Sequence, residues 1–153
     1  MLVRNGPHRR SGSTLVESAI VYSALFLVVF GLILGAIAVF HYHQCAQLAR
    51  EGSRWASVHG ADWATKNNHA PTTQDDVYQN AIQRKAVGMD PAKMSCAVSW
   101  DSGQRPTVPY VDAATNTVKT TNNNVSVTVS YLWDGFLFGP VTLQSTSVST
   151  MHY

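Results

Sequence analysis

The residues whose types and spacing could do chemistry lie near the amino end of this 153-residue sequence. Glu17 stands five residues after Gly12 and directly before a long apolar run, and Arg9 and Arg10 precede both. A carboxylate at the mouth of an apolar helix is costly unless an opposite charge pairs with it, so it indicates a functional site. A first-turn acid that complements the helix dipole is the simpler alternative. The dipole accounts for the position of Glu17, but not for the basic leader and the glycine that accompany it.

The run from Ala19 to Phe40 contains no Asp, Glu, Lys, Arg or Pro, and its apolar residues would cover every side of a helix. Such a helix would be about 33 Å long, which matches a bilayer hydrocarbon core of about 30 Å. A chain of this size could hardly bury the helix on all sides, so the run predicts a membrane span. Because Arg4, Arg9 and Arg10 precede it, we expect a cytoplasmic amino end and an extracytoplasmic carboxyl-terminal domain.

A basic leader, Gly12, four residues, Glu17 and a long apolar run together resemble the class III signal of type IV prepilins and pseudopilins. In that family a prepilin peptidase cuts directly after the glycine, so the resemblance implies a processing site between Gly12 and Ser13. Within the superfamily, residues 9–57 look most like the TadE-like proteins, which are minor pseudopilins of tight-adherence (Flp) pilus systems.

Two details place the resemblance within that superfamily. The run from Ala49 to Ala56 resembles the AREGAR-A segment that follows the membrane helix in TadE-like proteins. Ser18 stands where the major pilin of these systems usually has Tyr, which favours a minor pseudopilin over a major pilin.

The resemblance implies a function in pilus assembly and adhesion. Glu17 would pair with the terminal amine of a neighbouring subunit during assembly. The partners would be the prepilin peptidase, other pilins or pseudopilins, the inner-membrane assembly platform and membrane lipid. The chain would sit in the bacterial inner membrane as a single-pass protein, and at the pilus or cell surface after assembly.

Two other topologies compete with this interpretation. A secretory signal peptide would need a small-residue cleavage site, which Ala36 to Ala38 supplies, although its apolar region would be longer than usual. An uncleaved single-pass anchor presenting a ligand-binding or sensing domain would need neither Gly12 nor Glu17.

Within the predicted span, Gly31 and Gly35 form a GxxxG pattern. Small residues four apart let another helix approach closely in lipid, so the pair is a candidate helix-packing site. Chance GxxxG pairs are common in apolar helices, and the pattern alone does not identify a partner.

Cys45 and Cys96 are the only two cysteines, and both would lie outside the membrane, where a disulfide is possible. Two buried thiols, or an intermolecular link through Cys45, are the alternatives. His41, His43 and Cys45 resemble a metal cluster, but only His41 and Cys45 share a helical face. Interfacial polar residues explain this group better than a metal, so no metal site is predicted.

No enzyme is predicted, because the sequence contains no GxSxG, HExxH or P-loop motif. No cofactor is predicted either. From His41 onward the chain has 8 basic and 8 acidic residues, so its charge gives no reason to expect nucleic-acid binding.

The candidate residues described above predict three segments: a leader (1–12), a long helix (13–58) containing the span (19–40), and a small extracytoplasmic domain (59–153). We expect the helix to begin near Ser13 or Thr14, either of which can cap it, with Glu17 at capping-box spacing from Thr14, and His59-Gly60 to end it. Residues 61–73 read as a loop.

For the rest of the domain we expect one helix and about three antiparallel strands, an α+β fold. The helix would run from Thr73 toward Gly88. Loops or turns are expected at 102–109, 122–124 and 133–140, the last carrying an apolar patch of Trp133, Phe136, Leu137 and Phe138. Alternating apolar residues predict strands at 94–100, 125–131 and 141–151.

Overall fold

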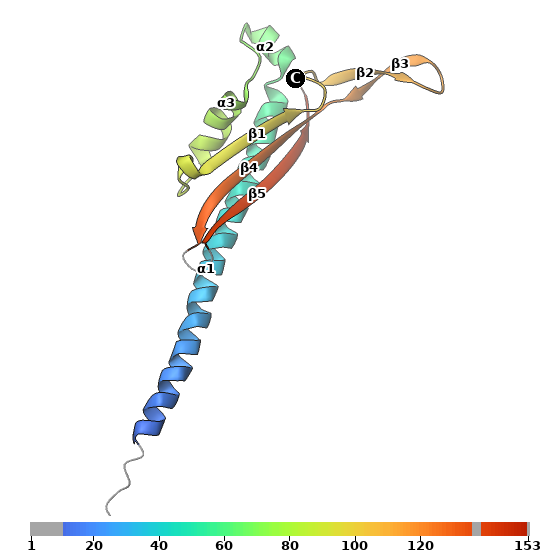
Figure 1. The fold of residues 1–153 in the computed structure, drawn as a ribbon. Coiled ribbons are helices and arrows are strands. Elements are labelled where there is room, and N and C mark those ends of the chain that lie inside the picture. Colours follow the sequence, from blue (N-terminus) through green and yellow to red (C-terminus); the bar gives the residue numbers. More distant parts are fainter. Residues whose placement is uncertain (1–10, 136–138, 153) are drawn as a thin grey trace, which may run out of the picture. The chain divides into compact units, whose positions relative to one another are not determined.

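A computed structural model of the chain describes residues 11–135 and 139–152, apart from the side chains of Ser11 and Ser13. It confirms the α+β class: one long helix precedes a small domain of short helices and antiparallel strands (Figure 1). The chain divides into two compact units, residues 1–37 and residues 38–153, which are described separately. In chain order the elements are α1 (Ser11–Val58), α2 (Ala61–Asn67), α3 (Gln74–Val77), the π-helical turn η1 (Tyr78–Ile82), the 3-10 turns η2 (Gln83–Lys85) and η3 (Pro91–Lys93), β1 (Met94–Trp100), β2 (Thr107–Asp112), β3 (Thr117–Asn122), β4 (Asn124–Gly135) and β5 (Gly139–Thr150).

The described part of the first unit is the apolar part of α1. Leu15, Leu27 and Leu32 are 72%, 73% and 70% exposed, so apolar side chains cover the helix on all sides. Its most apolar 18-residue window has a mean hydropathy of 2.7, and none of that window is buried. By length and composition the helix can cross a membrane, which is consistent with single-pass anchoring.

The start of α1 differs from the sequence prediction. The chain is already helical at Ser11, so Thr14 lies inside the helix and the predicted capping box with Glu17 is wrong. The carbonyl of Thr14 instead accepts a hydrogen bond of 2.7 Å from the Ser18 hydroxyl, one turn further on. Residues 1–10 of the expected leader lie outside the described residues. The other end of α1, Val58, agrees with the predicted stop at His59-Gly60.

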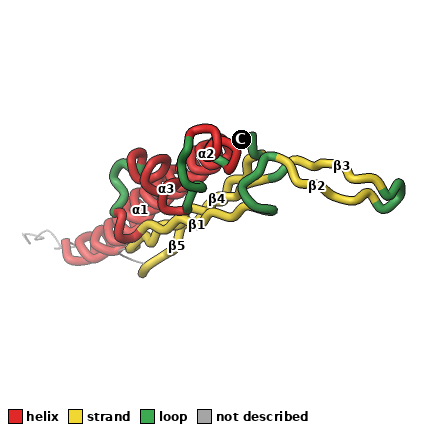
Figure 2. Tube along the Cα trace, turned by 90° about the horizontal axis from the view of Figure 1, so that it is seen from above, coloured by secondary structure: helices red, strands yellow, loops and turns green. Residues whose placement is uncertain are grey.

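The second unit is built on a three-stranded antiparallel sheet with strand order β1-β4-β5. All three strands were predicted, and β1 has the expected bounds. Along β4 every second side chain is buried, from Val125 to Tyr131, and the serines and threonine between them face outward. The helices cover the buried face of this sheet (Figures 1 and 2). The strand alternation therefore separates a helix-covered face from a polar, exposed face.

The outer part of α1 packs on this sheet through small side chains. Ala49, Gly52, Ser53 and Ala56 are all buried, at the three- and four-residue spacing of one helical face. A Cβ added to Gly52 would lie 3.0 Å from Cγ1 of Val127 on β4. Only a residue without a side chain fits this close approach between helix and strand.

A second, two-stranded sheet, β2–β3, was missed by the sequence analysis, which placed loops over 102–109 and a turn at 122–124. It extends away from the body of the domain as a hairpin (Figure 2). Pro109 lies inside β2, and a ribbon of two edge strands tolerates the missing N–H.

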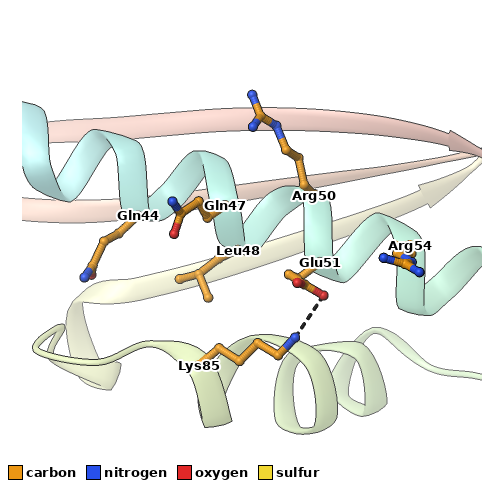
Figure 3. Close-up of a pocket in the computed structure, with 7 residues that line it drawn as sticks. All are labelled: Gln44, Gln47, Leu48, Arg50, Glu51, Arg54 and Lys85. Atoms are coloured by element: carbon orange, nitrogen blue, oxygen red, sulfur yellow. Dashed lines mark ion pairs between the residues drawn. The ribbon is translucent and has the colours of Figure 1, made fainter.

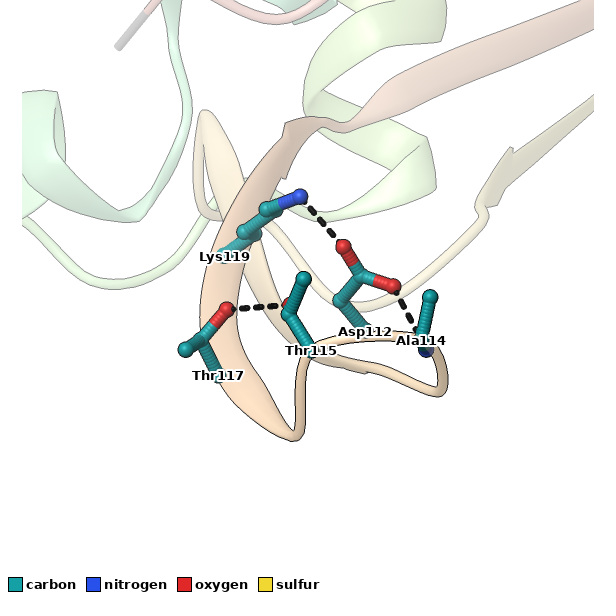
Figure 4. Close-up of polar contacts among 5 residues, drawn as sticks. All are labelled: Asp112, Ala114, Thr115, Thr117 and Lys119. Carbon is teal, nitrogen blue, oxygen red and sulfur yellow. Dashed lines mark hydrogen bonds and ion pairs between the residues drawn. The ribbon is translucent and has the colours of Figure 1, made fainter.

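The tip of this hairpin is held by polar contacts (Figure 4). The Asp112 carboxylate accepts a 3.0 Å hydrogen bond from the Ala114 N–H and pairs with Lys119. The hydroxyls of Thr115 and Thr117 are 2.7 Å apart. Asn116 adopts a left-handed conformation (φ 50°), which asparagine tolerates better than most residues.

The expected turn at 122–124 is instead a buried polar junction around Asn123. Its amide donates to the carbonyls of Gly103 (2.7 Å) and Arg105 (2.9 Å). Its side-chain oxygen accepts from the backbone N–H groups of Ser102 and Asn124. Asn123 therefore joins the base of the hairpin to the start of β4.

Residues 61–73, predicted as a loop, contain the short helix α2. It ends at Asn68, which adopts the left-handed conformation of a C-cap (φ 54°, ψ 41°). The next helix begins as predicted, because Thr73 and Asp76 form a capping box at the start of α3. That helix continues as a π-helical turn and a 3-10 turn and ends at Lys85, before Gly88.

The predicted loop at 133–140 is also shorter than expected. β4 continues to Gly135 and β5 begins at Gly139, which forms a positive-φ position (φ 74°) at the hairpin end. Trp133 lies in β4 and packs against the core cluster. The rest of the predicted apolar patch, Phe136 to Phe138, lies outside the described residues.

Candidate functional site

The first candidate site is the amino-terminal motif. Gly12 and the backbone of Ser13 lie in the first turn of α1, so the predicted scissile bond is helical in this structure. Helix ends fray easily, so local unwinding would expose this bond to a peptidase. Glu17 is exposed and, among the described residues, makes no hydrogen bond or ion pair. The motif thus presents an unpaired carboxylate near the end of an apolar helix.

The second candidate is the GxxxG pair. Gly31 and Gly35 lie in α1, and a Cβ added to either would meet no atom within 4 Å. The surface of the helix at these residues is open to a close neighbour. Whether another helix packs there stays a prediction.

The Ala49–Ala56 run, which carries the family resemblance, has two chemically different sides. Its small residues face the sheet, whereas Arg50, Glu51 and Arg54 are exposed. Together with Lys85 and neighbouring residues of α1, these charged residues line a hollow of about 330 Å³ (Figure 3). Glu51 and Lys85 form a 2.9 Å ion pair that lowers the pKa of the Glu51 carboxyl, chiefly through the hydrogen bond. Because both side chains are about half exposed, this pair contributes little stability.

Cys45 and Cys96, the possible disulfide, are free thiols in the structure. Cys45 is fully buried in the hydrophobic core, and Cys96 packs against the same cluster. Burial raises the pKa of both thiols, that of Cys96 to about 11. Both therefore behave as small apolar side chains that are unreactive at neutral pH.

The histidines beside the span do not gather around a metal position. The His41 ring lies 5.2 Å from the Tyr131 ring, and His43 lies beside Tyr42. Across residues 11–135 and 139–152, no group of three or more His, Cys, Asp or Glu side chains is arranged to hold a metal ion.

The structure also shows a cleft that the sequence analysis missed. Its cavity of about 480 Å³ is lined by aromatic and polar side chains: Trp55, His59, Trp63, His69, Ala70, Thr72, Asp76, Asn80 and Arg84. The sequence signal was present as Trp55, His59 and Trp63 at four-residue spacing. Gly60, which lies between His59 and Trp63, was interpreted only as the end of the long helix.

The fold and the amino-terminal motif define a class: an α+β domain that follows a single apolar helix able to anchor it in a membrane. Comparison with protein families is more specific, because residues 12–54 match the family model for TadE-like protein. The resemblance recognised in the sequence is confirmed for this segment, which fits a pilus-associated membrane protein. The chain matches no curated protein and no solved structure.

Proposed function

We propose that the chain is a minor pseudopilin of a tight-adherence pilus system. The observation that carries the proposal is the TadE-like match over residues 12–54, which begins at the predicted processing glycine and includes Glu17. The exposed apolar part of α1 supports it, because a precursor of this kind waits in the inner membrane until assembly.

The proposed mechanism begins with cleavage by a prepilin peptidase between Gly12 and Ser13. Cleavage removes Arg4, Arg9 and Arg10 and leaves a new amine at Ser13. The Glu17 carboxylate of one subunit then pairs with this amine on a neighbouring subunit. At 4 Å and an effective dielectric constant of about 20, such a pair is worth about 4 kcal/mol before desolvation. This attraction sets the axial offset between one helix and its neighbour in the assembly.

Close packing of the apolar helices supports the same assembly. Small residues at Gly31 and Gly35 allow a neighbouring helix to approach, since nothing in the described chain fills the space beside them. The subunit would prime or cap the pilus, and the other pilins and the inner-membrane platform would be its partners.

The mass and amino-terminal sequence of the membrane-extracted protein, co-expressed with its native prepilin peptidase, test the processing step. We expect a chain that begins at Ser13, and an uncut chain for Gly12→Leu. A Met1 start in the wild type would instead support an uncleaved anchor presenting a sensing domain. A start just after Ala38 would indicate a secreted protein.

Glu17→Ala tests the assembly step separately. We expect normal membrane insertion and normal cleavage, but loss of pilus assembly, because only the intersubunit charge pair is removed. Ser18→Ala, one residue along the same helix, is the matched control. Normal assembly by Glu17→Ala, or failure to insert, would contradict the proposed role of Glu17.

A further inference from the structure

The aromatic cleft contains a ladder of four rings. Trp55 at the end of α1 stacks on His59 with ring centroids 4.0 Å apart and planes 11° apart. His59 meets Trp63 of α2 edge to face at 4.5 Å. Trp63 in turn stacks on His69 at 5.3 Å and 13°. These distances are those of favourable aromatic pairs, so the ladder is one rigid aromatic wall.

A row of hydrogen-bonding side chains also lines the same cavity. Asp76, Asn80 and Arg84 follow one another at four-residue spacing along α3, η1 and η2. The π-helical turn keeps Ala81 and Ile82 in the core while this row remains exposed. π-turns inside helices occur frequently at functional sites. The cleft thus combines an aromatic wall with a row of polar side chains.

Backbone contacts fix the aromatic wall before any ligand arrives. The left-handed conformation of Asn68 turns the chain after α2, and the His69 N–H donates to the Ala64 carbonyl at 2.9 Å. Buried Thr72 donates from its hydroxyl to the His59 carbonyl and accepts from the Gln104 amide at its own carbonyl. The loop that carries His69 is therefore tied to the end of α1.

The polar row keeps unused hydrogen-bonding capacity. The capping box holds one Asp76 oxygen, Oδ2, against Thr73, and the other oxygen accepts no hydrogen bond within the described chain. The Asn80 amide donates to the Asp76 carbonyl, which leaves its own side-chain oxygen available. In the same described ranges, Arg84 forms no ion pair with any carboxylate. An acceptor, an amide oxygen and a guanidinium thus remain free for a ligand.

The aromatic wall is more than an extension of the core. Trp55 packs against the core cluster, but Trp63 and His69 do not belong to it. Trp63 lies outside the core and is partly exposed beside a cavity of ligand size. Large apolar rings exposed in this way often mark binding sites. Trp63 therefore offers ring area that the fold itself does not require.

We propose that this cleft binds a pyranose saccharide. The C–H face of a sugar ring packs on the part of the Trp63 indole that His59 and His69 leave exposed, and Asp76, Asn80 and Arg84 hydrogen-bond its hydroxyl groups. A sugar is amphipathic in this way, with an apolar ring face and a polar edge, which matches the aromatic wall and the polar row. Asp76 and Arg84 carry opposite charges and leave the row without net charge, so a polyanion such as nucleic acid is not favoured.

The test uses the full chain in detergent micelles, labelled and applied to an array of oligosaccharides of glucose, galactose, N-acetylhexosamines and uronic acids. We expect the wild type to bind at least one of these classes with saturation. Trp63→Ala should weaken that binding by about tenfold or more, since stacking on one ring is lost. Arg84→Gln should weaken it severalfold, whereas Arg50→Gln, a change to an exposed arginine of α1 that lines neither the cleft nor the smaller pocket next to it, should leave it unchanged.

No binding to any class would overturn the proposal, as would equal binding by wild type, Trp63→Ala and Arg84→Gln. Trp63→Phe guards against loss of folding, because it keeps a ring in α2 and should retain most of the binding if stacking is the cause. A thermal unfolding curve for each variant shows that the domain is folded. The result is independent of processing, because a chain beginning at Met1 and one beginning at Ser13 contain the same cleft.

Discussion

Gly52 offers the sharpest test of how the domain is attached to α1. In Gly52→Ala the new Cβ would lie 3.0 Å from Cγ1 of Val127 and 3.3 Å from Cδ1 of Ile82. Both neighbours are fully buried, and Val127 is a β-branched residue on the central strand, so it cannot rotate away. Overpacking of this kind costs about 2 kcal/mol. Alanine recovers about 1 kcal/mol of helix propensity, so the net loss in unfolding free energy is about 1 kcal/mol.

Urea unfolding of the full chain in mild detergent, followed by tryptophan fluorescence, measures this loss. Gln47→Ala, on the exposed side of the same helix, is the matched control and should change the unfolding free energy by less than about 0.5 kcal/mol. Val127→Ala supplies a second check, because removing Cγ1 makes room for the alanine at position 52. The double variant should be more stable than the two single losses predict, by about 1 kcal/mol. Wild-type stability or better for Gly52→Ala, or strictly additive losses, would refute the close-packing argument.

Three further predictions concern the second unit. Asn123→Ala should lower the unfolding free energy by about 2 kcal/mol in the same urea assay, because the carbonyls of Gly103 and Arg105 and the N–H of Ser102 lose the buried side chain that bonds them. Hydrogen bonds from the Thr73 backbone and hydroxyl lower the pKa of Asp76, so this carboxylate stabilises the fold above its unfolded pKa and loses that effect as the pH falls below about 4. Thr73→Ala should lower the unfolding free energy at pH 7 by about 1 kcal/mol, and it should reduce the further decrease in unfolding free energy between pH 7 and pH 3. Urea midpoints across this pH range measure both effects. An unchanged decrease between pH 7 and pH 3 would contradict the role given to Asp76. Cys45 and Cys96 should resist alkylation by iodoacetamide in the folded chain, because both thiols are shielded and have raised pKa values. In denaturant without reductant, the mass of the chain should increase by two alkyl groups. A mass without any added alkyl group would reveal a disulfide.

The elements that the sequence predicted well are those with a strong periodic pattern. The uncharged run ending at Phe40 required a long helix, and the alternation from Val125 to Tyr131 required a strand with one buried face. The helix start at Thr73 was likewise predicted from local residues, and the structure shows Thr73 and Asp76 forming a capping box there. In each case the determining interactions lie within a few residues of one another.

The missed elements depend on contacts between distant segments. Asn123 looked like part of a polar turn, but its side chain bonds the backbone at Ser102, Gly103 and Arg105, about twenty residues earlier. In the sequence, Gly52 is only a residue of low helix propensity. Its close contact with Val127 is visible only in the folded structure. Neither role can be derived from the spacing of neighbouring residues.

The aromatic cleft was missed for a related reason. Trp55, His59 and Trp63 could have been recognised as one row, but Gly60 interrupts the helix between them and hides the continuity. The polar row of Asp76, Asn80 and Arg84 has helical four-residue spacing, but only the fold places it beside the aromatic side chains at the end of α1 and in α2. The amino-terminal resemblance, in contrast, was visible in the sequence, because its residues lie close together in the chain, and the family match over residues 12–54 confirms it for that segment.

The small-residue side of outer α1 has a consequence for any neighbour of this helix. Since Ala49, Gly52 and Ala56 are already occupied by the chain's own sheet, an adjacent subunit can reach only the opposite side, where Arg50 and Arg54 are exposed. In the proposed assembly, contact with a neighbouring helix beside Gly31 and Gly35 would depend on shape. Beside these arginines it depends on charge and therefore on ionic strength. In that assembly α1 would contact its neighbours through a salt-insensitive surface near Gly31 and Gly35 and a salt-sensitive surface near Arg50 and Arg54.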